Sequence, residues 1–232
     1  SETAFAASTQ ESRQILTGVH LVLTNHKEFK AVATDSHRMS QRKLTLDHSS
    51  DDFDVVIPSR SLREFATVFT DDIESVEVFF SNSQILFRSE YISFYTRLLE
   101  GNYPDTDRLL GNNFETEVVF NTNALRYAME RAHLISNATQ NGTVKLEIIN
   151  NQVTAHVNSP EVGKVNEELD IESLSGNDLT ISFNPTYLIE ALKALKSETV
   201  TIRFISPIRP FTLTPSDNSE NFIQLITPVR TN

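Results

Sequence analysis

The sequence contains no cysteine among its 232 residues, which excludes disulfide bonds, thiolate zinc sites and a cysteine nucleophile. It has only six glycines, and none belongs to a glycine-rich phosphate loop. No apolar run approaches the roughly 20 residues that a membrane-spanning helix needs. The first ten residues lack the basic and then apolar layout of a secretory signal. These absences favour a cytoplasmic protein.

Residues that could carry catalysis are scattered rather than clustered. The six histidines show neither an HExxH motif nor paired metal-ligand spacing. Asp35, Ser36 and His37 are the residue types of a catalytic triad, but consecutive side chains point in divergent directions and cannot form a relay. Two acidic pairs, Asp51–Asp52 and Asp71–Asp72, lie in turn-like positions and are expected to cap or solubilise. We therefore expect no catalytic residue, no metal and no cofactor.

The formal net charge of −11 at face value disfavours nucleic acid as a partner, because phosphate contacts need Lys and Arg. The charge is unevenly distributed, however. Seven Lys/Arg and five Asp/Glu fall on four predicted helical segments, 1–13, 59–70, 123–136 and 185–197. One such helix is typical of a solvated surface. Four equivalent helices with a mild positive excess in total suit a surface that passes close to phosphates without reading bases.

A repeat organises the chain. Three segments share an apolar strand, a polar cap and a helix with an apolar stripe, and their strand ends lie 63 residues apart, at Ile57, Phe120 and Phe183. The residues predicted to cap the helices are Ser59, Asn121 and Asn184, and Pro185 suits a first helical position. The apolar stripes recur at three- and four-residue spacing, at Leu62, Phe65 and Phe69, at Leu125, Ala128, Ala132 and Ile135, and at Leu188, Leu192 and Leu195.

Alternating strands broken by turn residues surround each helix. They predict hairpins that pair 19–23 with 29–33, 76–80 with 85–87, and 144–148 with 153–157. The unit is therefore β-α-β-β-β. One unit exposes too much sheet edge to stand alone, so we expect an α+β fold of two tandem domains, 1–108 and 109–232. Each domain pairs two such units, with helices on one face of antiparallel sheets.

The same 63-residue period places the first strand end at about position −6, before the sequence begins. Glu2 to Gln10 then corresponds to the tail of a helix that begins earlier. We therefore expect the chain to be a fragment of a longer protein.

Four motifs resemble one family. Ala33-Thr34-Asp35-Ser36-His37-Arg38-Met39 resembles the T-D-G-H-R-L signature in the middle domain of the bacterial DNA polymerase III beta sliding clamp. The segments 99–105, 183–188 and 227–230 resemble its inter-domain segment, its last helix start and its C-terminal tail. Together these motifs are specific, and the resemblance covers the whole chain as the middle and C-terminal domains of a three-domain subunit.

The resemblance implies a non-catalytic processivity factor of the DNA polymerase III holoenzyme. The family forms a homodimeric head-to-tail ring of six similar domains that encloses duplex DNA without sequence readout, and this fragment is not expected to close it. Polymerase, clamp loader and repair proteins dock through short peptides with Gln and Leu/Phe. The implied cleft residues are Leu16, Thr34, His37, Arg38, Met39, Pro104, Arg108, Leu109, Ile208, Pro210, Ile226, Pro228, Val229 and Arg230. Ser36 and Met39 depart from the family's usual glycine and leucine.

The resemblance also implies a DNA-facing surface with Gln10, Arg13, Arg60, Arg126, Arg131 and Lys196, and a ring junction at Leu134 and Ile135. Leu134 lies off the buried stripe of its helix, which is a further hint of an interface. Two alternatives stay open. One is a nuclease or transferase subunit with its own active site, and the other is an interaction module unrelated to DNA.

Overall fold

The computed structural model describes residues 2–70, 73, 75–136, 142–159, 163–217 and 221–230. The chain divides into two compact units, unit 1 at Ser1–Asp105 and unit 2 at Thr106–Asn232. Within the described residues, no helix is long and apolar enough to cross a membrane. Each unit is described below by itself.

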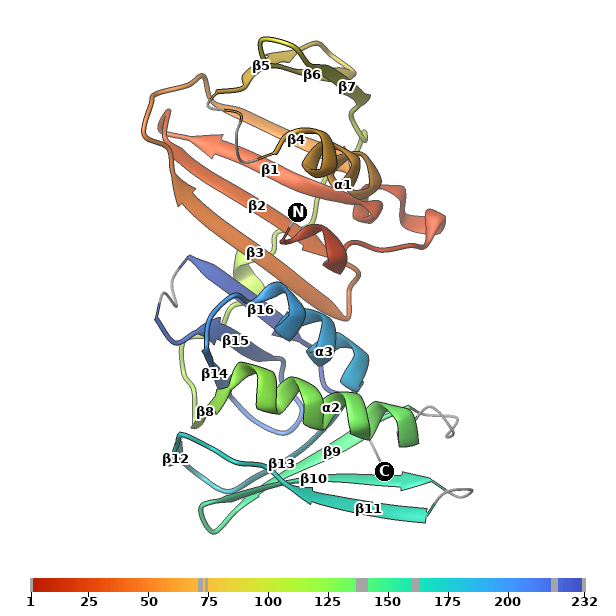
Figure 1. The fold of residues 1–232 in the computed structure, drawn as a ribbon, viewed down its shortest axis with the longest axis vertical. Coiled ribbons are helices and arrows are strands. Elements are labelled where there is room, and N and C mark those ends of the chain that lie inside the picture. Colours follow the sequence, from red (N-terminus) through yellow and green to blue (C-terminus); the bar gives the residue numbers. More distant parts are fainter. Residues whose placement is uncertain are drawn as a thin grey trace. The chain divides into compact units, whose positions relative to one another are not determined.

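The described residues of unit 1 form one α-helix, two short 3-10 helices and two antiparallel sheets (Figure 1). Its elements are η1 Ala4–Ala6, η2 Glu11–Thr17, β1 Gly18–Thr24, β2 Glu28–Thr34, β3 Arg38–Thr45, β4 Phe53–Pro58, α1 Ser59–Val68, β5 Glu77–Phe80, β6 Gln84–Arg88 and β7 Ser93–Arg97. One sheet has the order β3-β2-β1-β4 and the other β5-β6-β7. The helix α1 therefore connects the last strand of the first sheet to the second sheet.

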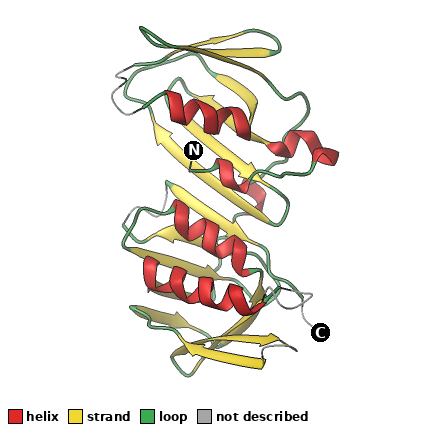
Figure 2. Cartoon of the chain, turned by 45° about the vertical axis from the view of Figure 1, so that its right-hand side comes forward, coloured by secondary structure: helices red, strands yellow, loops and turns green. Residues whose placement is uncertain are grey.

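The described residues of unit 2 include two α-helices that pack side by side (Figure 2). Its elements are η3 Asp107–Leu109, β8 Thr116–Asn121, α2 Thr122–Ser136, β9 Val144–Ile149, β10 Gln152–Ser159, β11 Gly163–Glu168, β12 Ser173–Gly176, β13 Leu179–Phe183, α3 Pro185–Ala194, β14 Thr199–Phe204, β15 Phe211–Pro215 and β16 Phe222–Ile226. Its strands form the orders β12-β8-β14-β15-β16 and β11-β10-β9-β13. Helix α2 leads from the first of these sheets to the second, and α3 leads back.

The predicted β-α-β-β-β unit is present three times, as β4-α1-β5-β6-β7, β8-α2-β9-β10-β11 and β13-α3-β14-β15-β16. The strand β12 is an addition to the pattern. All the strand pairs within each unit are antiparallel. The predicted α+β class is confirmed. The chain divides at residues 105 and 106, whereas the sequence prediction placed the boundary after Arg108.

Two of the three predicted helix caps are correct. The Asn184 side chain accepts a hydrogen bond from the Thr186 N–H at 2.9 Å, with Pro185 at the first helical position. The Asn121 Oδ1 accepts from the Ala124 N–H at 3.0 Å. The prediction for Ser59 is wrong, because Pro58 occupies the cap position and Ser59 is already helical and buried.

The predicted helix over residues 1–13 is also wrong. The chain forms a 3-10 turn at η1, becomes extended at Ala7, and enters η2, which is kinked at Arg13. The Ser8 hydroxyl accepts the Gln10 N–H at 3.0 Å, and the Ser8 N–H donates to the Leu16 carbonyl at 2.8 Å. These hydrogen bonds compete with the bonds that a helix would form. Serine often interrupts helices in this way, because its hydroxyl can bond to a nearby backbone N–H.

The three helices bury their predicted stripes to different depths. Leu188, Leu192 and Leu195 of the α3 segment are buried, although α3 itself ends at Ala194 rather than at Ser197. The α1 stripe is only partly buried. Its Phe65 ring packs among other aromatic rings, with its centroid 4.5 Å from the centroid of the Phe87 ring. The face that α2 buries is wider than predicted, since it contacts both α3 and β10. It includes Met129, which the predicted stripe omitted.

The hairpin predicted around Asn150 and Asn151 is confirmed. Strands β9 and β10 pair with Gln152 opposite Ile149, and both asparagines have left-handed backbone angles, with φ of 50° and 63°. Two successive residues in this conformation match the right-handed twist of the strands, and asparagine tolerates it better than most residues.

Replacing Asn151 therefore tests the turn. Asn151→Ala is expected to lower the free energy of unfolding by about 1 kcal/mol, because a residue with a Cβ and no local hydrogen bond is strained in the left-handed region. Asn151→Gly is the matched control, and its free energy of unfolding should equal or exceed that of the native chain. Urea titration followed by circular dichroism measures both. An alanine variant as stable as the glycine variant would contradict the assigned turn.

Candidate functional site

The turn between β2 and β3, residues 34–38, carries three of the predicted cleft residues and is held by its own hydrogen bonds. The Thr34 hydroxyl donates to the Arg38 carbonyl at 2.6 Å and accepts the Ser36 N–H at 3.2 Å. The Asp35 N–H donates to the same Arg38 carbonyl at 3.3 Å. These bonds close a turn whose shape does not depend on a ligand.

Asp35 fixes this turn through its carboxylate. One oxygen accepts the His37 and Arg38 N–H groups at 2.9 and 3.0 Å, and the other accepts the Arg38 Nε–H at 3.0 Å. The Arg38 guanidinium also donates to the Phe5 carbonyl at 3.1 Å. A carboxylate with these partners has a structural role in holding the turn.

Ser36 stands where the family motif usually has glycine, and the backbone explains that preference. Its φ is 77°, in the left-handed region that glycine adopts without strain. The Arg13 Nη1 donates to the Ser36 hydroxyl at 3.1 Å. Serine at this position therefore has a strained backbone conformation, and its hydroxyl forms a hydrogen bond with the N-terminal segment that glycine could not form.

Tyr103 ties a distant segment to this turn. Its hydroxyl accepts the Thr34 N–H at 3.1 Å across 69 residues of sequence. Its ring lies 4.8 Å from the His20 ring, and the His20 Nε2 is 2.6 Å from Asp54 Oδ1. Burial raises the pKa of the Tyr103 hydroxyl well above its usual range, against the opposing effect of the Thr34 N–H. The hydroxyl therefore stays protonated at neutral pH.

The other predicted cleft residues differ in exposure. In unit 1, His37 and Pro104 are exposed, whereas Leu16, Thr34 and Met39 are buried, with Met39 only 1% exposed. In unit 2, the exposed members are Arg108, Leu109, Ile208, Val229 and Arg230, the half-buried ones are Pro210 and Pro228, and Ile226 is buried. The Val229 N–H donates to the Ser182 carbonyl at 2.7 Å, which fastens the tail to β13.

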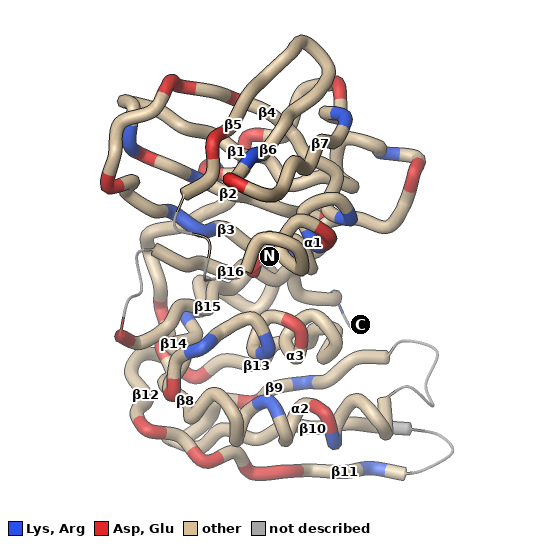
Figure 3. The backbone as a smooth tube through the Cα atoms, turned by 45° about the horizontal axis from the view of Figure 1, so that its top comes forward, with Lys and Arg blue, Asp and Glu red and all other residues tan. Residues whose placement is uncertain are grey.

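Four of the residues predicted to face DNA meet an acceptor within their own unit: Arg13, Arg60, Arg126 and Arg131. Lys193, which was not among the predicted residues, shares the acceptor of Arg126. In unit 2, Arg126 Nη1 and Lys193 Nζ both lie 3.1 Å from Glu130 Oε1, so one carboxylate joins α2 to α3. Lys193 and Arg126 lower the pKa of Glu130, with the Lys193 hydrogen bond the larger cause. Figure 3 shows Lys/Arg and Asp/Glu interspersed along these helices.

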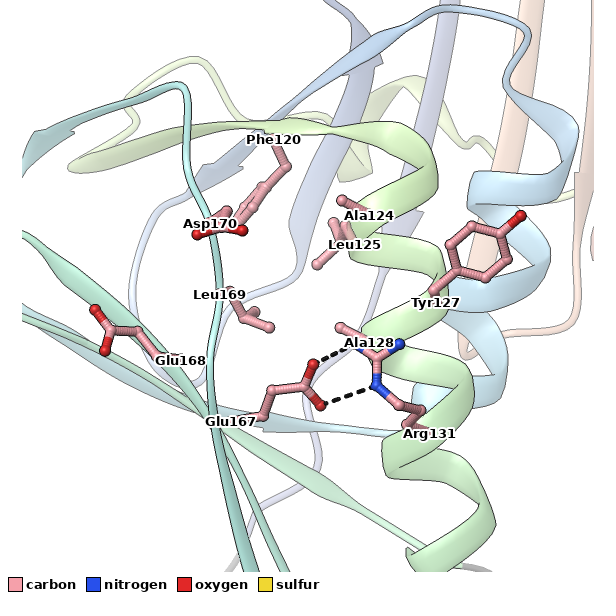
Figure 4. A pocket seen from close by; sticks show the side chains of 10 residues that line it. All are labelled: Phe120, Ala124, Leu125, Tyr127, Ala128, Arg131, Glu167, Glu168, Leu169 and Asp170. Carbon is pink, nitrogen blue, oxygen red and sulfur yellow. Dashed lines mark hydrogen bonds and ion pairs between the residues drawn. The ribbon is translucent and has the colours of Figure 1, made fainter.

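Arg131 forms the second such pair, with Glu167 of β11. The two side chains point toward one another across a groove of about 180 Å³ between α2 and the segment that contains Leu169 (Figure 4). Glu168 and Asp170 also line this groove. Its rim is therefore acidic, and Arg131 is its one basic lining residue among the described residues.

In unit 1, Arg60 pairs with Glu64 one turn along α1, at 3.1 Å, and its side chain is largely exposed. Arg13 and Gln10 lie on no α-helix, contrary to the predicted helix 1–13. In unit 2, Lys196 is exposed and follows the end of α3. That the predicted residues of unit 1 and of unit 2 face one common side stays a prediction.

The predicted ring-junction residues lie near the C-terminal end of α2. Leu134 is 75% exposed, and Ile135 is half-buried. A large apolar side chain with this exposure contributes little to the core of its own unit.

Comparisons with known proteins agree with this architecture. Residues 1–105 match the family model of the DNA polymerase III beta subunit, central domain, and residues 107–230 match that of its C-terminal domain. The chain is 74% identical over 231 residues to the Beta sliding clamp of Streptococcus pneumoniae serotype 4 and 57% identical over 233 residues to that of Lactococcus lactis. It covers 61% of the length of each of these relatives, and all of its own length is matched.

Solved structures are similar as well. The beta subunit from DNA polymerase of Streptococcus pyogenes is 81% identical with a TM-score of 0.96, covering 99% of this chain and 62% of that one. The DNA polymerase sliding clamp from Bacillus subtilis is 39% identical with a TM-score of 0.93, covering 100% and 61%. The fold is thus that of the DNA sliding clamps. The chain belongs to the DNA polymerase III beta subunit family.

Sequence reasoning missed the residues that act across elements. Tyr103 positions Thr34, Glu130 positions Arg126 and Glu167 positions Arg131, yet none of the three was singled out. Only Glu130 carries a local signal, because it lies four residues after Arg126 on one helix, the spacing at which opposite charges meet.

The hydrogen bond of Tyr103 can be tested by removing only its hydroxyl. Tyr103→Phe leaves the Thr34 N–H without its acceptor and is expected to lower the free energy of unfolding by about 1–2 kcal/mol. Tyr91→Phe is the matched control, since Tyr91 is 87% exposed and its hydroxyl meets only Glu90; it should change stability by less than about 0.5 kcal/mol. Equal losses of stability in the two urea titrations would show that the Tyr103 hydroxyl does not stabilise the turn.

Proposed function

We propose that the chain is part of a sliding clamp, a processivity factor that encircles duplex DNA and docks the replicative polymerase. The observation that carries this proposal is the succession of two family-model matches along the chain, 1–105 and 107–230. The relatives that match it bear the name Beta sliding clamp. As in those proteins, the proposed action is to hold DNA by enclosure, which needs no base contacts.

The proposed docking site for partner peptides uses the residues that the family resemblance identifies in each unit. Its unit 1 part is the turn at 34–38, which is already closed by Asp35 and Tyr103. A preformed turn avoids the entropy cost of ordering a loop on binding. Its unit 2 part offers exposed apolar side chains at Ile208 and Val229, which suit the Leu or Phe of a partner peptide. Polymerase, clamp loader and repair proteins are the proposed partners.

The alternative, a nuclease or transferase subunit with its own active site, finds less support. Among the described residues, no group of His, Asp and Glu could hold a metal ion. Asp52, of one predicted acidic pair, accepts the His26 N–H at 2.7 Å. The other pair, Asp71–Asp72, lies outside the described residues. We propose a non-catalytic subunit of the cytoplasmic replication machinery.

A peptide titration tests the docking proposal. A fluorescein-labelled peptide with a Gln and a Leu-Phe pair is expected to bind the chain, and Ile208→Ser should raise its Kd about five- to thirtyfold, as the loss of an apolar anchor does. Ile149→Ser is the control, because Ile149 is also exposed but belongs to the β9–β10 hairpin. If the peptide fails to bind, or if both variants bind it like the native chain, the docking site is wrong.

The proposed ring junction makes a separate prediction about Leu134. Leu134→Ser should change the free energy of unfolding by less than about 0.5 kcal/mol, because the side chain is mostly exposed. Leu125→Ser, on the buried side of the same helix, should cost about 3 kcal/mol or more. Urea titration compares the two. A core-like loss at Leu134 would show that this residue serves its own unit rather than a junction.

A further inference from the structure

Glu130 occupies a position that the proposed DNA-facing role of α2 and α3 does not explain. Its Oε1 lies 3.1 Å from both Arg126 Nη1 and Lys193 Nζ, so one negative charge neutralises much of two positive charges. All three side chains are partly exposed, at 33%, 20% and 55% for Glu130, Arg126 and Lys193. The group therefore lies at the surface, within reach of a ligand from solvent.

Arg126 is held in place by more than this ion pair. Its guanidinium lies 4.4 Å from the centroid of the Tyr127 ring, and its Nη2 donates to Asn123 Oδ1 at 3.3 Å. The residue would thus keep its place near the helix surface if Glu130 lost its charge. Lys193 has a flexible stem and depends more on the carboxylate.

We propose that Glu130 acts as an internal competitor for DNA phosphate, which keeps the affinity of this helical surface low. The inference rests on the proposed function, because it concerns the strength of DNA binding by α2 and α3. A phosphate that approaches Arg126 or Lys193 displaces the Glu130 carboxylate, and each cation exchanges one anionic partner for another. The net gain is small, since the lost ion pair offsets the new one.

Such exchange suits a protein that moves along DNA. Phosphate contacts that release condensed counterions supply most non-specific affinity. A basic side chain that already pairs with a carboxylate causes a smaller net release of ions when it contacts a phosphate. Both the affinity for DNA and the salt dependence of that affinity are therefore lower. Arg131 is paired in the same way with Glu167, which extends the arrangement to a second cation on α2.

The experiment compares two charge-neutralising variants of the whole chain, Glu130→Gln and Glu147→Gln. Glu147 also holds two basic partners, with Lys145 Nζ at 2.6 Å and His156 Nε2 at 3.0 Å. It belongs to β9 rather than to the helices, and its neighbours Leu146 and Ile148 are buried. Both substitutions change the net charge equally, so a general electrostatic effect would appear in both.

Binding of a fluorescein-labelled 30-base-pair DNA duplex is measured by anisotropy between 50 and 200 mM NaCl. Glu130→Gln is expected to bind more tightly than the native chain and to steepen the salt dependence by about one ion, which enlarges the ratio of affinities at these two salt concentrations about three- to fourfold. Glu147→Gln should keep the native salt slope. Adding Arg126→Gln to Glu130→Gln should remove most of the gain.

The outcomes separate this inference from the function on which it rests. If the native chain binds DNA and Glu130→Gln binds no more tightly than Glu147→Gln, the competitor role is wrong while the clamp proposal stands. If neither the native chain nor Glu130→Gln binds the duplex at 50 mM NaCl, the lowest salt concentration of the titration, the DNA-facing role of these helices is wrong as well. Circular dichroism confirms that each variant is folded.

Discussion

The burial of three strand-end side chains holds each helix to its sheet. Ile57 and Phe120 are the next-to-last residues of β4 and β8, and Phe183 is the last residue of β13; all three are at most 1% exposed, and a helix begins two residues after each. A strand with a buried apolar residue at or next to its end cannot shift by one position without turning that residue toward solvent. The start of every helix is thereby fixed in register with the sheet beneath it, and so are the charged residues that the helices expose.

This constraint also explains which features could be predicted from the sequence. The strand ends depend on residues that are close in sequence, and the structure places them at Pro58, Asn121 and Phe183, within one residue of the prediction. The caps at Asn121 and Asn184 and the Asn150–Asn151 hairpin are equally local, so local patterns reveal them. The helix predicted at 1–13 failed because Ser8 forms competing local bonds that hydrophobic periodicity does not register. The bond from Thr34 to Tyr103 spans 69 residues, so local spacing could not indicate it.

The ion pairs of the helices also combine residues that are close in sequence with residues that are distant. The counts of basic and acidic residues on the predicted helices placed Arg60, Arg63, Arg126, Arg131 and Lys193 on α-helices, but did not indicate what neutralises them. Arg131 meets Glu167 across 36 residues, and Lys193 meets Glu130 from another helix. A net charge of −11 is therefore compatible with DNA-facing helices, since some of the acidic residues act as partners of the basic ones.

Burial decides which of these ion pairs can exchange partners. The Asp35 and Arg38 side chains are 16% and 11% exposed, and their bonds close a turn, so an external anion could displace Asp35 only by opening that turn. Arg131 and Glu167 are 58% and 30% exposed and close no turn, so water or phosphate can replace either partner at little cost. The same chemical pair thus fixes geometry where it is buried and remains exchangeable where it is exposed. The proposed function uses both, because the proposed docking turn must keep its shape whereas the proposed contacts to DNA must break each time the protein moves.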